Sequence, residues 1–341
     1  MTKKSLFFYI ALLIIVAIGL RYYFFGKRDI SLHAPRGSFG VGTAVYYFTE
    51  NNREEIHSLN KEARKLVVQL WYPAKIGSGD KLYPFMADIK DHIKKKMSRK
   101  INKSIDRYAY LDTVTTHAYL NAPIDLQRNK FPLILFSTGL GSNRHLFSSY
   151  AQELASHGYI VAIIDRPYAS NVVMLENGTI IEEDRSLRTD IVKNEETCER
   201  EMKLWLGDLS YVLDQLEMIN RKDSKNIFTN HIDLSEIGVM GHSFGGSVAL
   251  AFCASDKRCK AGISFDSGPI CNEKKFGQMF VLNKPFMFLL AGKNLMAIKL
   301  RAAIDTYSPV GKKDVYKLTI SHADHNSFGD SQLIFPSRFY I

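Results

Sequence analysis

Short apolar runs alternate with amphipathic stretches along most of the chain. The apolar runs have the length of buried strands and lie at residues 131–136, 159–164, 237–240, 261–265 and 286–291, and a further predicted strand follows at residues 315–320. Apolar side chains with helical spacing lie between some of them, at residues 146–157, 194–220 and 245–254. Buried strands that alternate with helices predict an α/β fold with a mostly parallel central sheet and helices on both faces.

Two further patterns predict antiparallel pairing. Residues 41–49 and 65–72 are rich in β-formers and are separated by a polar stretch, which is typical of two neighbouring antiparallel strands. Residues 172–175 and 179–182 flank an Asn-Gly pair, which is the strongest short-range signal for a β-hairpin. No internal repeat, linker or low-complexity tract follows, so we expect one domain over residues 29–341.

The first 28 residues are of a different kind. Lys3 and Lys4 precede an apolar run over residues 6–20, and Arg21, four aromatic residues and two more basic residues follow. The run is shorter than the roughly 20 residues that a membrane span needs and resembles the apolar region of a signal peptide. Arg21 can snorkel, however, and the aromatic residues can lie at the interface. We expect residues 1–28 to be an uncleaved signal-anchor, with a cleaved signal peptide and a core helix as alternatives.

Both leading interpretations of this segment place the domain outside the cytoplasm, in a periplasmic or extracellular location. The protein is then membrane-anchored, or secreted if the segment is cleaved. In such an oxidising compartment, Cys253 and Cys259 form either a short disulfide or two buried free thiols. The four cysteines of the chain are too few for a disulfide scaffold, and none forms the C-x-x-C pair of a structural zinc site.

Composition narrows the function classes. With 46% hydrophobic and 23% charged residues, the chain is neither disordered nor a polytopic membrane protein. The net charge of +10 is compatible with nucleic acid or anionic lipid as a partner. No helix-turn-helix, zinc-finger or RNA-recognition signature is present, so we expect no nucleic-acid partner. Clusters of Asp or His that suit a metal are also absent from the sequence, and we expect neither a metal nor another cofactor.

The most specific motif is Gly-His-Ser-Phe-Gly-Gly at residues 241–246. It lies between a predicted strand and a predicted helix, which is the context of a nucleophile elbow. The glycines at 241 and 245 allow strand and helix to pass close to the turn. Ser243 then lies above the sheet edge at a helix N-terminus, which favours a developing anion. We predict that Ser243 is the nucleophile; the alternative is a Gly-rich turn with a capping serine.

A serine nucleophile needs a base and an acid that orients the base. In hydrolases with this elbow, the acid and then the histidine follow the serine in the chain. His322 and His325 both follow the predicted strand at residues 315–320. We predict that His325 is the base, because the loop after it can direct its ring back to the sheet.

The acid is predicted partly by elimination. Its usual position is after the strand at residues 286–291, but no Asp or Glu occurs between Glu273 and Asp305. Asp266 ends the strand that follows the nucleophile strand, and therefore lies at the same sheet edge. We predict that Asp266 is the acid; the alternative is an Asp that caps a turn.

An oxyanion hole needs two backbone N–H groups. The residue after the nucleophile, Phe244, supplies one of them. The second comes from the loop after an early strand, which here reads Ser-Thr-Gly-Leu-Gly at residues 137–141. The glycines on both sides of Leu140 allow its N–H to turn inward, so we predict Leu140 and Phe244 as the two donors.

Residues 81–104 combine a helical pattern with a strongly basic character. The apolar stripe recurs every four residues and consists of Phe85, Ile89, Ile93, Met97 and Ile101. The basic residues between them are Lys90, Lys94, Lys95, Lys96, Arg99, Lys100 and Lys103. Such a helix suits either an anionic membrane surface, with residues 85–103 near the substrate mouth, or packing on the core with solvated lysines. The sequence leaves both interpretations open.

These motifs together resemble the platelet-activating-factor acetylhydrolases of the plasma/isoform II type. The likeness rests on Gly-His-Ser-Phe-Gly-Gly, on Thr-Gly-Leu-Gly at residues 138–141 and on an Asp one strand after the nucleophile. Asp-Arg-Pro-Tyr at residues 165–168 is more like the bacterial members. Further matching segments are residues 35–43, 67–74, 119–123, 155–162 and 258–262. One departure is Thr138, where the family usually has His.

The resemblance implies a calcium-independent serine esterase. Ser243, Asp266 and His325 carry over as its triad, and Leu140 and Phe244 as its oxyanion donors. The substrate would be a phospholipid with a short or oxidised acyl chain, or a simpler ester as in bacterial relatives, cleaved through an acyl-enzyme. The alternative is a membrane-tethered, non-catalytic binding protein on a hydrolase fold, because fold alone does not determine function. The complete Ser-Asp-His set favours the enzyme.

Overall fold

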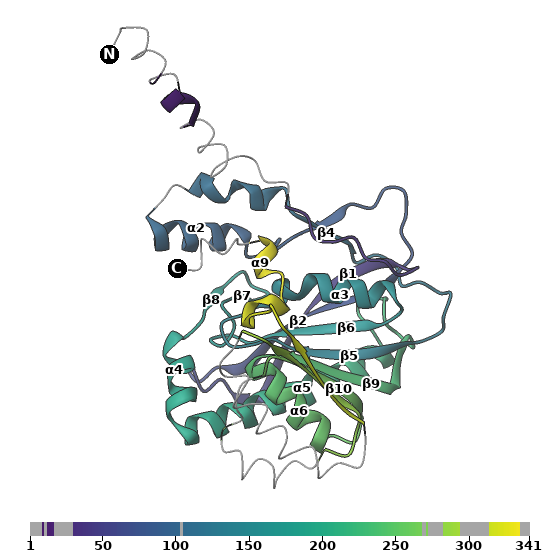
Figure 1. Ribbon diagram of the computed structural model, residues 1–341. Helices are drawn as coiled ribbons and strands as arrows, with labels where there is room; N and C mark the ends of the chain where they lie inside the picture. The colour runs from purple at the N-terminus through teal and green to yellow at the C-terminus, as the bar shows by residue number, and fades with distance from the viewer. Residues whose placement is uncertain are drawn as a thin grey trace.

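The structure is a computed structural model (Figure 1), and it describes residues 9, 12–16, 30–102, 105–267, 271, 282–293 and 314–334. The predicted anchor at residues 1–28 therefore lies almost wholly outside the described residues, and its assignment stays a prediction. Among the helices of the described ranges, none has the length and apolarity that a membrane span requires.

A ten-stranded sheet forms the centre of the domain, in the order β12-β11-β10-β9-β5-β6-β2-β1-β4-β3. From β12 to β6 in this order the strands run parallel, which confirms the predicted mostly parallel sheet. The strands are β1 (Gly40–Glu54), β2 (Ala63–Ala74), β3 (Leu82–Pro84), β4 (Thr115–Leu120), β5 (Phe131–Ser137), β6 (Ile160–Asp165), β9 (Ile232–His242), β10 (Cys259–Phe265), β11 (Phe286–Ala291) and β12 (Val315–Ile320).

Helices cover both faces of this sheet (Figure 1). They are α2 (Lys90–Ile101), α3 (Ser148–Ser156), α4 (Arg185–Lys193), α5 (Glu195–Arg221), α6 (Phe244–Ser255) and α9 (Ser331–Ile334), with 3₁₀ turns η1 (Ile105–Asp112), η2 (Arg144–Phe147) and η3 (His325–Phe328). In β5, Leu133 and Leu135 pack in the core on the α5–α6 side, whereas Ile134 and Phe136 pack on the α3 side. Successive strand residues point to opposite faces, so one apolar run contributes side chains to the core on each face of the sheet.

The two antiparallel predictions are confirmed. β1 pairs with β2 in antiparallel register, from Gly40 opposite Ala74 onward. The Asn-Gly segment joins β7 (Val172–Met174) to β8 (Ile180–Glu182) in a two-stranded hairpin.

The helix expected over residues 81–104 is wrong at its beginning. Leu82–Pro84 forms β3, which pairs with β4, and the helix starts only at Lys90. Pro84 lacks an N–H and restricts the residue before it to extended conformations, which favours a strand end over a helix here. The helix expected at residues 146–157 is also divided, into η2 and α3.

The apolar stripe of α2 packs inside the protein. Phe85, Ile89 and Ile93 are buried against Tyr108 and Leu111 of η1, so the packing interpretation of this segment is confirmed. The stripe is therefore not available for insertion into a bilayer, which separates α2 from a free membrane-surface helix. Contact of its lysines with an anionic membrane stays a prediction. Lys103 lies outside the described residues.

Both cysteine pairs form disulfides. Cys253 is bonded to Cys259, which decides between the two alternatives that the sequence left open. Cys198 at the start of α5 is bonded to Cys271, a pairing that the sequence did not suggest because the two residues are 73 positions apart. Cys271 follows Asp266 by only a few residues, so the bond ties the segment after β10 to α5.

We expect the long-range disulfide to contribute more stability than the short one. In the chain-entropy account, a loop of 73 residues is worth about 4 kcal/mol and a loop of 6 residues about 2 kcal/mol. Cys198→Ser should therefore lower the free energy of unfolding more than Cys253→Ser, as measured by guanidinium denaturation without reductant. An equal or smaller loss for Cys198→Ser would contradict a stabilising role for this bond.

Candidate active site

The segment predicted as a nucleophile elbow has that geometry. Ser243 lies between β9 and α6 with φ 55° and ψ −129°, a strained conformation for a residue with a side chain. A Cβ on Gly241 would lie 2.2 Å from the Gly245 carbonyl oxygen, and a Cβ on Gly245 would lie 2.2 Å from that of Ser137. The Ser243 N–H donates to the Phe265 carbonyl at 2.9 Å. The glycines therefore allow the close approach that the turn requires.

Asp266 and His325 are brought together at the same sheet edge. The His325 ring bonds through Nδ1 to Asp266 Oδ2 at 2.7 Å. The Asp266 carboxylate is buried, and its Oδ1 accepts the Ala291 N–H at 3.0 Å from the end of β11. The Asp266 N–H also donates to the Leu289 carbonyl at 2.7 Å. The acid thus follows β10 but is held by β11, the strand after which the acid of such hydrolases usually lies.

The loop that carries His325 is fixed at its beginning. Asp324 caps η3: its side chain accepts the Asn326 N–H at 2.9 Å, while Ser327 Oγ accepts the Asp324 N–H at 3.0 Å. His322, the other candidate base, is exposed, and the ring that bonds Asp266 is that of His325. Asp305, the next carboxylate that sequence analysis considered, lies outside the described residues.

His242 was not singled out by sequence analysis, although it directly precedes the predicted nucleophile. Its Nε2–H donates to the backbone carbonyl of His325 at 2.9 Å, and the two rings lie 4.6 Å apart. Burial, reinforced by the charge of a protonated His325, lowers the pKa of His242 to about 4. His242 is therefore neutral near neutral pH, and it links the nucleophile elbow to the His325 loop.

The two predicted oxyanion donors border the nucleophile. Phe244 is the first residue of α6, so its N–H has no partner within the helix. The loop before Leu140 packs on the nucleophile, since a Cβ on Gly139 would lie 3.0 Å from that of Ser243. Among the described residues, neither the N–H of Leu140 nor that of Phe244 has a hydrogen-bond partner. Both are therefore free to bind an anion.

Contacts on three sides hold the Leu140 loop. The Leu140 carbonyl accepts from Arg188 of α4 at 3.3 Å, and the Gly141 N–H donates to the Ala169 carbonyl at 2.8 Å. The buried Thr138 hydroxyl donates to the Ile164 carbonyl at 3.1 Å. Thr138, which departs from the usual His of the resembled family, thus anchors this loop to the end of β6.

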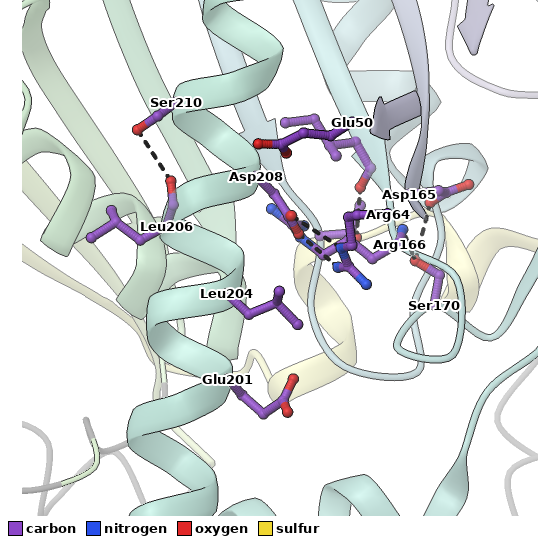
Figure 2. Close-up of polar contacts among 12 residues, drawn as sticks. Glu50, Arg64, Asp165, Arg166, Ser170, Glu201, Leu204, Leu206, Asp208 and Ser210 are labelled. Carbon is purple, nitrogen blue, oxygen red and sulfur yellow. Dashed lines mark hydrogen bonds and ion pairs between the residues drawn. The ribbon is translucent and has the colours of Figure 1, made fainter. Parts of the chain in front are cut away.

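A buried cluster of charges (Figure 2) contacts α6 through Trp205. Trp205 of α5 packs edge-to-face on Phe244 at 5.0 Å, and the Arg166 guanidinium lies 4.3 Å from the Trp205 ring centroid. Figure 2 shows Arg64 and Arg166 converging on Asp208, where Arg166 Nε and Arg64 Nη2 each donate to Oδ2 at 2.8 Å. Burial alone would raise the pKa of Asp208, but the charges of the two arginines hold it at about 2. The cluster is therefore ionised and fixes the ring beneath Phe244.

The predicted site residues Leu140, Ser243, Phe244, Asp266 and His325 all line one pocket of about 960 Å³. No hydrogen bond joins the Ser243 hydroxyl to the His325 ring in the described part of the chain, and such bonds often tighten only with substrate. The apolar lining consists of Met86, Ile93, Met97, Tyr108, Leu146, Phe147, Ile191 and Val192. Within the described ranges, no group of His, Cys, Asp and Glu is arranged to hold a metal ion.

Comparison with known proteins agrees with this arrangement. The sequence model of a family described as platelet-activating factor acetylhydrolase, isoform II, matches residues 26–339. The chain belongs to this family. A platelet-activating factor acetylhydrolase of Canis lupus familiaris is 28% identical over 246 residues, which are 65% of this chain and 53% of that protein. A probable 1-alkyl-2-acetylglycerophosphocholine esterase of Arthroderma benhamiae is 34% identical over 139 residues, which are 40% of this chain and 31% of that protein.

The chain thus spans between 31% and 60% of the length of the curated relatives that it matches. Among solved structures, a ferulic acid esterase from Streptomyces cinnamoneus superposes with a TM-score of 0.71. The superposition covers 91% of this chain and 85% of that one, at 23% sequence identity. At this identity the likeness concerns the fold, and it agrees with the α/β-hydrolase architecture predicted from the sequence.

Proposed function

We propose that this protein is a serine hydrolase of carboxylic esters, with Ser243 as nucleophile, His325 as base and Asp266 as the acid that orients it. The observation that carries the proposal is the 2.7 Å bond between His325 and Asp266 in the pocket lined by Ser243. Membership of the platelet-activating factor acetylhydrolase family supports lipid esters as substrates. A non-catalytic binding protein would not need this assembly.

Hydrolysis proceeds in two halves. His325 Nε2 takes the proton of the Ser243 hydroxyl while Oγ attacks the ester carbonyl. The oxyanion binds to the N–H groups of Leu140 and Phe244. His325 then gives the proton to the leaving alcohol, and an acyl-enzyme remains. Water, deprotonated by His325, attacks the acyl-enzyme and releases the acid and free Ser243.

The surroundings of the base suit this cycle. Asp266 stabilises the imidazolium and, through Nδ1, keeps the ring with Nε2 on the opposite side. His242 is neutral because of its low pKa, so no second positive charge opposes protonation of His325. The apolar lining of the pocket suits an acyl chain, which gains about 0.8 kcal/mol for each buried methylene.

A screen of p-nitrophenyl esters of increasing acyl length, beside a phospholipid with a short sn-2 chain, tests the proposal. We expect hydrolysis of short-chain esters and of the phospholipid, unaffected by EDTA, because no step of the cycle uses a metal. The Ser243→Ala variant serves as the blank. A folded protein that hydrolyses none of these esters and does not react with a fluorophosphonate would favour the binding-protein alternative.

We also propose that the domain works outside the cytoplasm, held to the membrane by residues 1–28 or secreted if they are removed. The disulfides Cys198–Cys271 and Cys253–Cys259 support an oxidising compartment. Alkylation of the free thiols of this protein in intact cells, before and after reduction, tests whether the disulfides form there. Cell fractionation tests whether the protein is held to the membrane or secreted. Four alkylated thiols without reduction would contradict it.

A further inference from the structure

The wall of the pocket that α2 and α4 build is rich in cations. Its basic lining residues are Lys96 and Lys100 of α2 and Arg185, Arg188 and Lys193 of α4. The acidic lining residues in the described ranges are Asp266 and Glu195, and the first of these is bonded to His325.

Two of these cations are neutralised by neighbours. Lys96 pairs with Glu182 at 2.9 Å, and Arg188 pairs with Glu183 at 2.8 Å while holding the Leu140 loop. The charges of Lys96 and Arg188 are therefore used in contacts within the protein.

The other three cations are not neutralised. Lys100, Arg185 and Lys193 are exposed, and within the described ranges none of them forms an ion pair or hydrogen bond through its side chain. They come from different turns of two helices, yet all three border the pocket that contains Ser243. A cleft with an excess of one sign of charge concentrates the field and attracts ions of the opposite sign.

The packing of α2 argues against a role of this helix in membrane insertion. Phe85, Ile89 and Ile93 are buried beneath the helix, so α2 cannot insert its apolar face into a bilayer while keeping this packing. The charges of Lys100, Arg185 and Lys193 instead belong to exposed side chains that line the same pocket as the apolar residues. A ligand with an apolar part and a negative group matches both features at once.

We propose that the pocket selects esters that carry an anionic group, a carboxylate or a phosphate, over neutral or zwitterionic esters. The acyl chain lies on the apolar lining, and Lys100, Arg185 and Lys193 attract the negative group. The proposal rests on the proposed ester hydrolysis and names its substrate class.

Two matched pairs of esters test the proposal. The first is the mono-p-nitrophenyl ester of glutaric acid beside p-nitrophenyl hexanoate, and the second is dihexanoyl phosphatidylglycerol beside dihexanoyl phosphatidylcholine. We expect kcat/KM to favour the anionic member by roughly tenfold at low salt and less at about 0.5 M salt, because salt screens exposed charges. Preference in the first pair alone identifies a soluble carboxylate ester, and preference in the second alone identifies an anionic lipid head group. Equal rates within both pairs would overturn the proposal.

Charge-removing variants assign the preference to these residues. In Lys100→Gln/Arg185→Gln/Lys193→Gln, the ratio of the anionic to the neutral rate should fall to about one. The matched control Lys75→Gln/Lys203→Gln/Arg221→Gln removes the same charge from exposed sites outside the pocket, and should keep the ratio. A triple pocket variant that hydrolyses neutral esters but keeps the anionic preference would overturn the proposal. If the parent protein itself hydrolysed no ester and did not react with a fluorophosphonate, that result would instead contradict the proposed function.

The single variants cover the case in which the triple pocket variant fails to fold. Each of Lys100→Gln, Arg185→Gln and Lys193→Gln should lower the anionic-to-neutral ratio by about twofold, since exposed charges act singly and weakly. If none of the three lowers the ratio, these residues do not select the substrate.

Discussion

Ser243→Ala should lower kcat for ester hydrolysis by at least about 10⁴-fold, because the members of a triad act as a unit. Without the hydroxyl there is no atom to attack the ester, although Leu140, Phe244 and His325 stay in position. The same variant should no longer react with a fluorophosphonate. Steady-state kinetics and gel-based labelling measure the two effects.

The elbow allows this substitution without a change of fold. Alanine has the same Cβ as serine, so the strained φ at this position costs no more than in the parent protein, and circular dichroism should be unchanged. Ser142→Ala, in the same pocket, is the matched control and should still be labelled. Labelling of Ser243→Ala at the parent rate would show that another residue is the nucleophile.

Sequence and structure agree best where one short segment determines the geometry. The turn at Ser243 needs glycine at 241 and 245 because backbone oxygens lie where their Cβ atoms would be. The same holds for β5 and β6, whose continuous apolar runs are buried on both faces, whereas most of β12 at the edge of the sheet is exposed. For this reason the fold and the five candidate site residues could be predicted from local patterns. The catalytic roles of these residues stay predictions.

The parts that the sequence did not predict depend on contacts between distant segments. His242 reaches the carbonyl of His325 only because β9 and η3 meet at the sheet edge. Arg166 and Trp205 meet through the packing of α5 on the sheet, and no local pattern marks such a pair. The edge strand β3 and its neighbour β4 are short or partly exposed, so they lack the apolar runs of the central strands.

The helix α4 also could not be predicted from a local pattern, although it supplies basic residues to the pocket. It buries only Leu187 and Ile191, a pattern too sparse to predict a helix that carries Arg185, Arg188 and Lys193 to the pocket. The basic segment at α2 was recognised from its sequence, but its neighbours decide what its charges do. Lys96 is paired, whereas Lys100 is not.

Asp266→Asn is expected to lower kcat by about 10⁴-fold while leaving the fold intact, as in other triads where the acid becomes an amide. The reason lies in two of the bonds that hold the carboxylate. Oδ1 accepts the Ala291 N–H, and Oδ2 bonds to His325 Nδ1. In the amide, the oxygen must remain opposite the Ala291 N–H, so the NH₂ group faces Nδ1. His325 then accepts at Nδ1 and carries its proton on Nε2, where it cannot take the proton of Ser243.

Nitrogen NMR of the His325 ring measures this change of tautomer directly, beside kcat and the rate of fluorophosphonate labelling. Asp324→Asn is the matched control on the same loop. Asparagine caps a helix about as well as aspartate, so this variant removes the charge of Asp324 and leaves both the cap of η3 and the acid in place. We expect its ring to keep the proton on Nδ1 and its kcat to fall far less than that of Asp266→Asn. If Asp324→Asn or Asp305→Asn abolished activity while Asp266→Asn remained active, a different carboxylate would orient the base, and the 2.7 Å contact between Asp266 and His325 would serve only the structure.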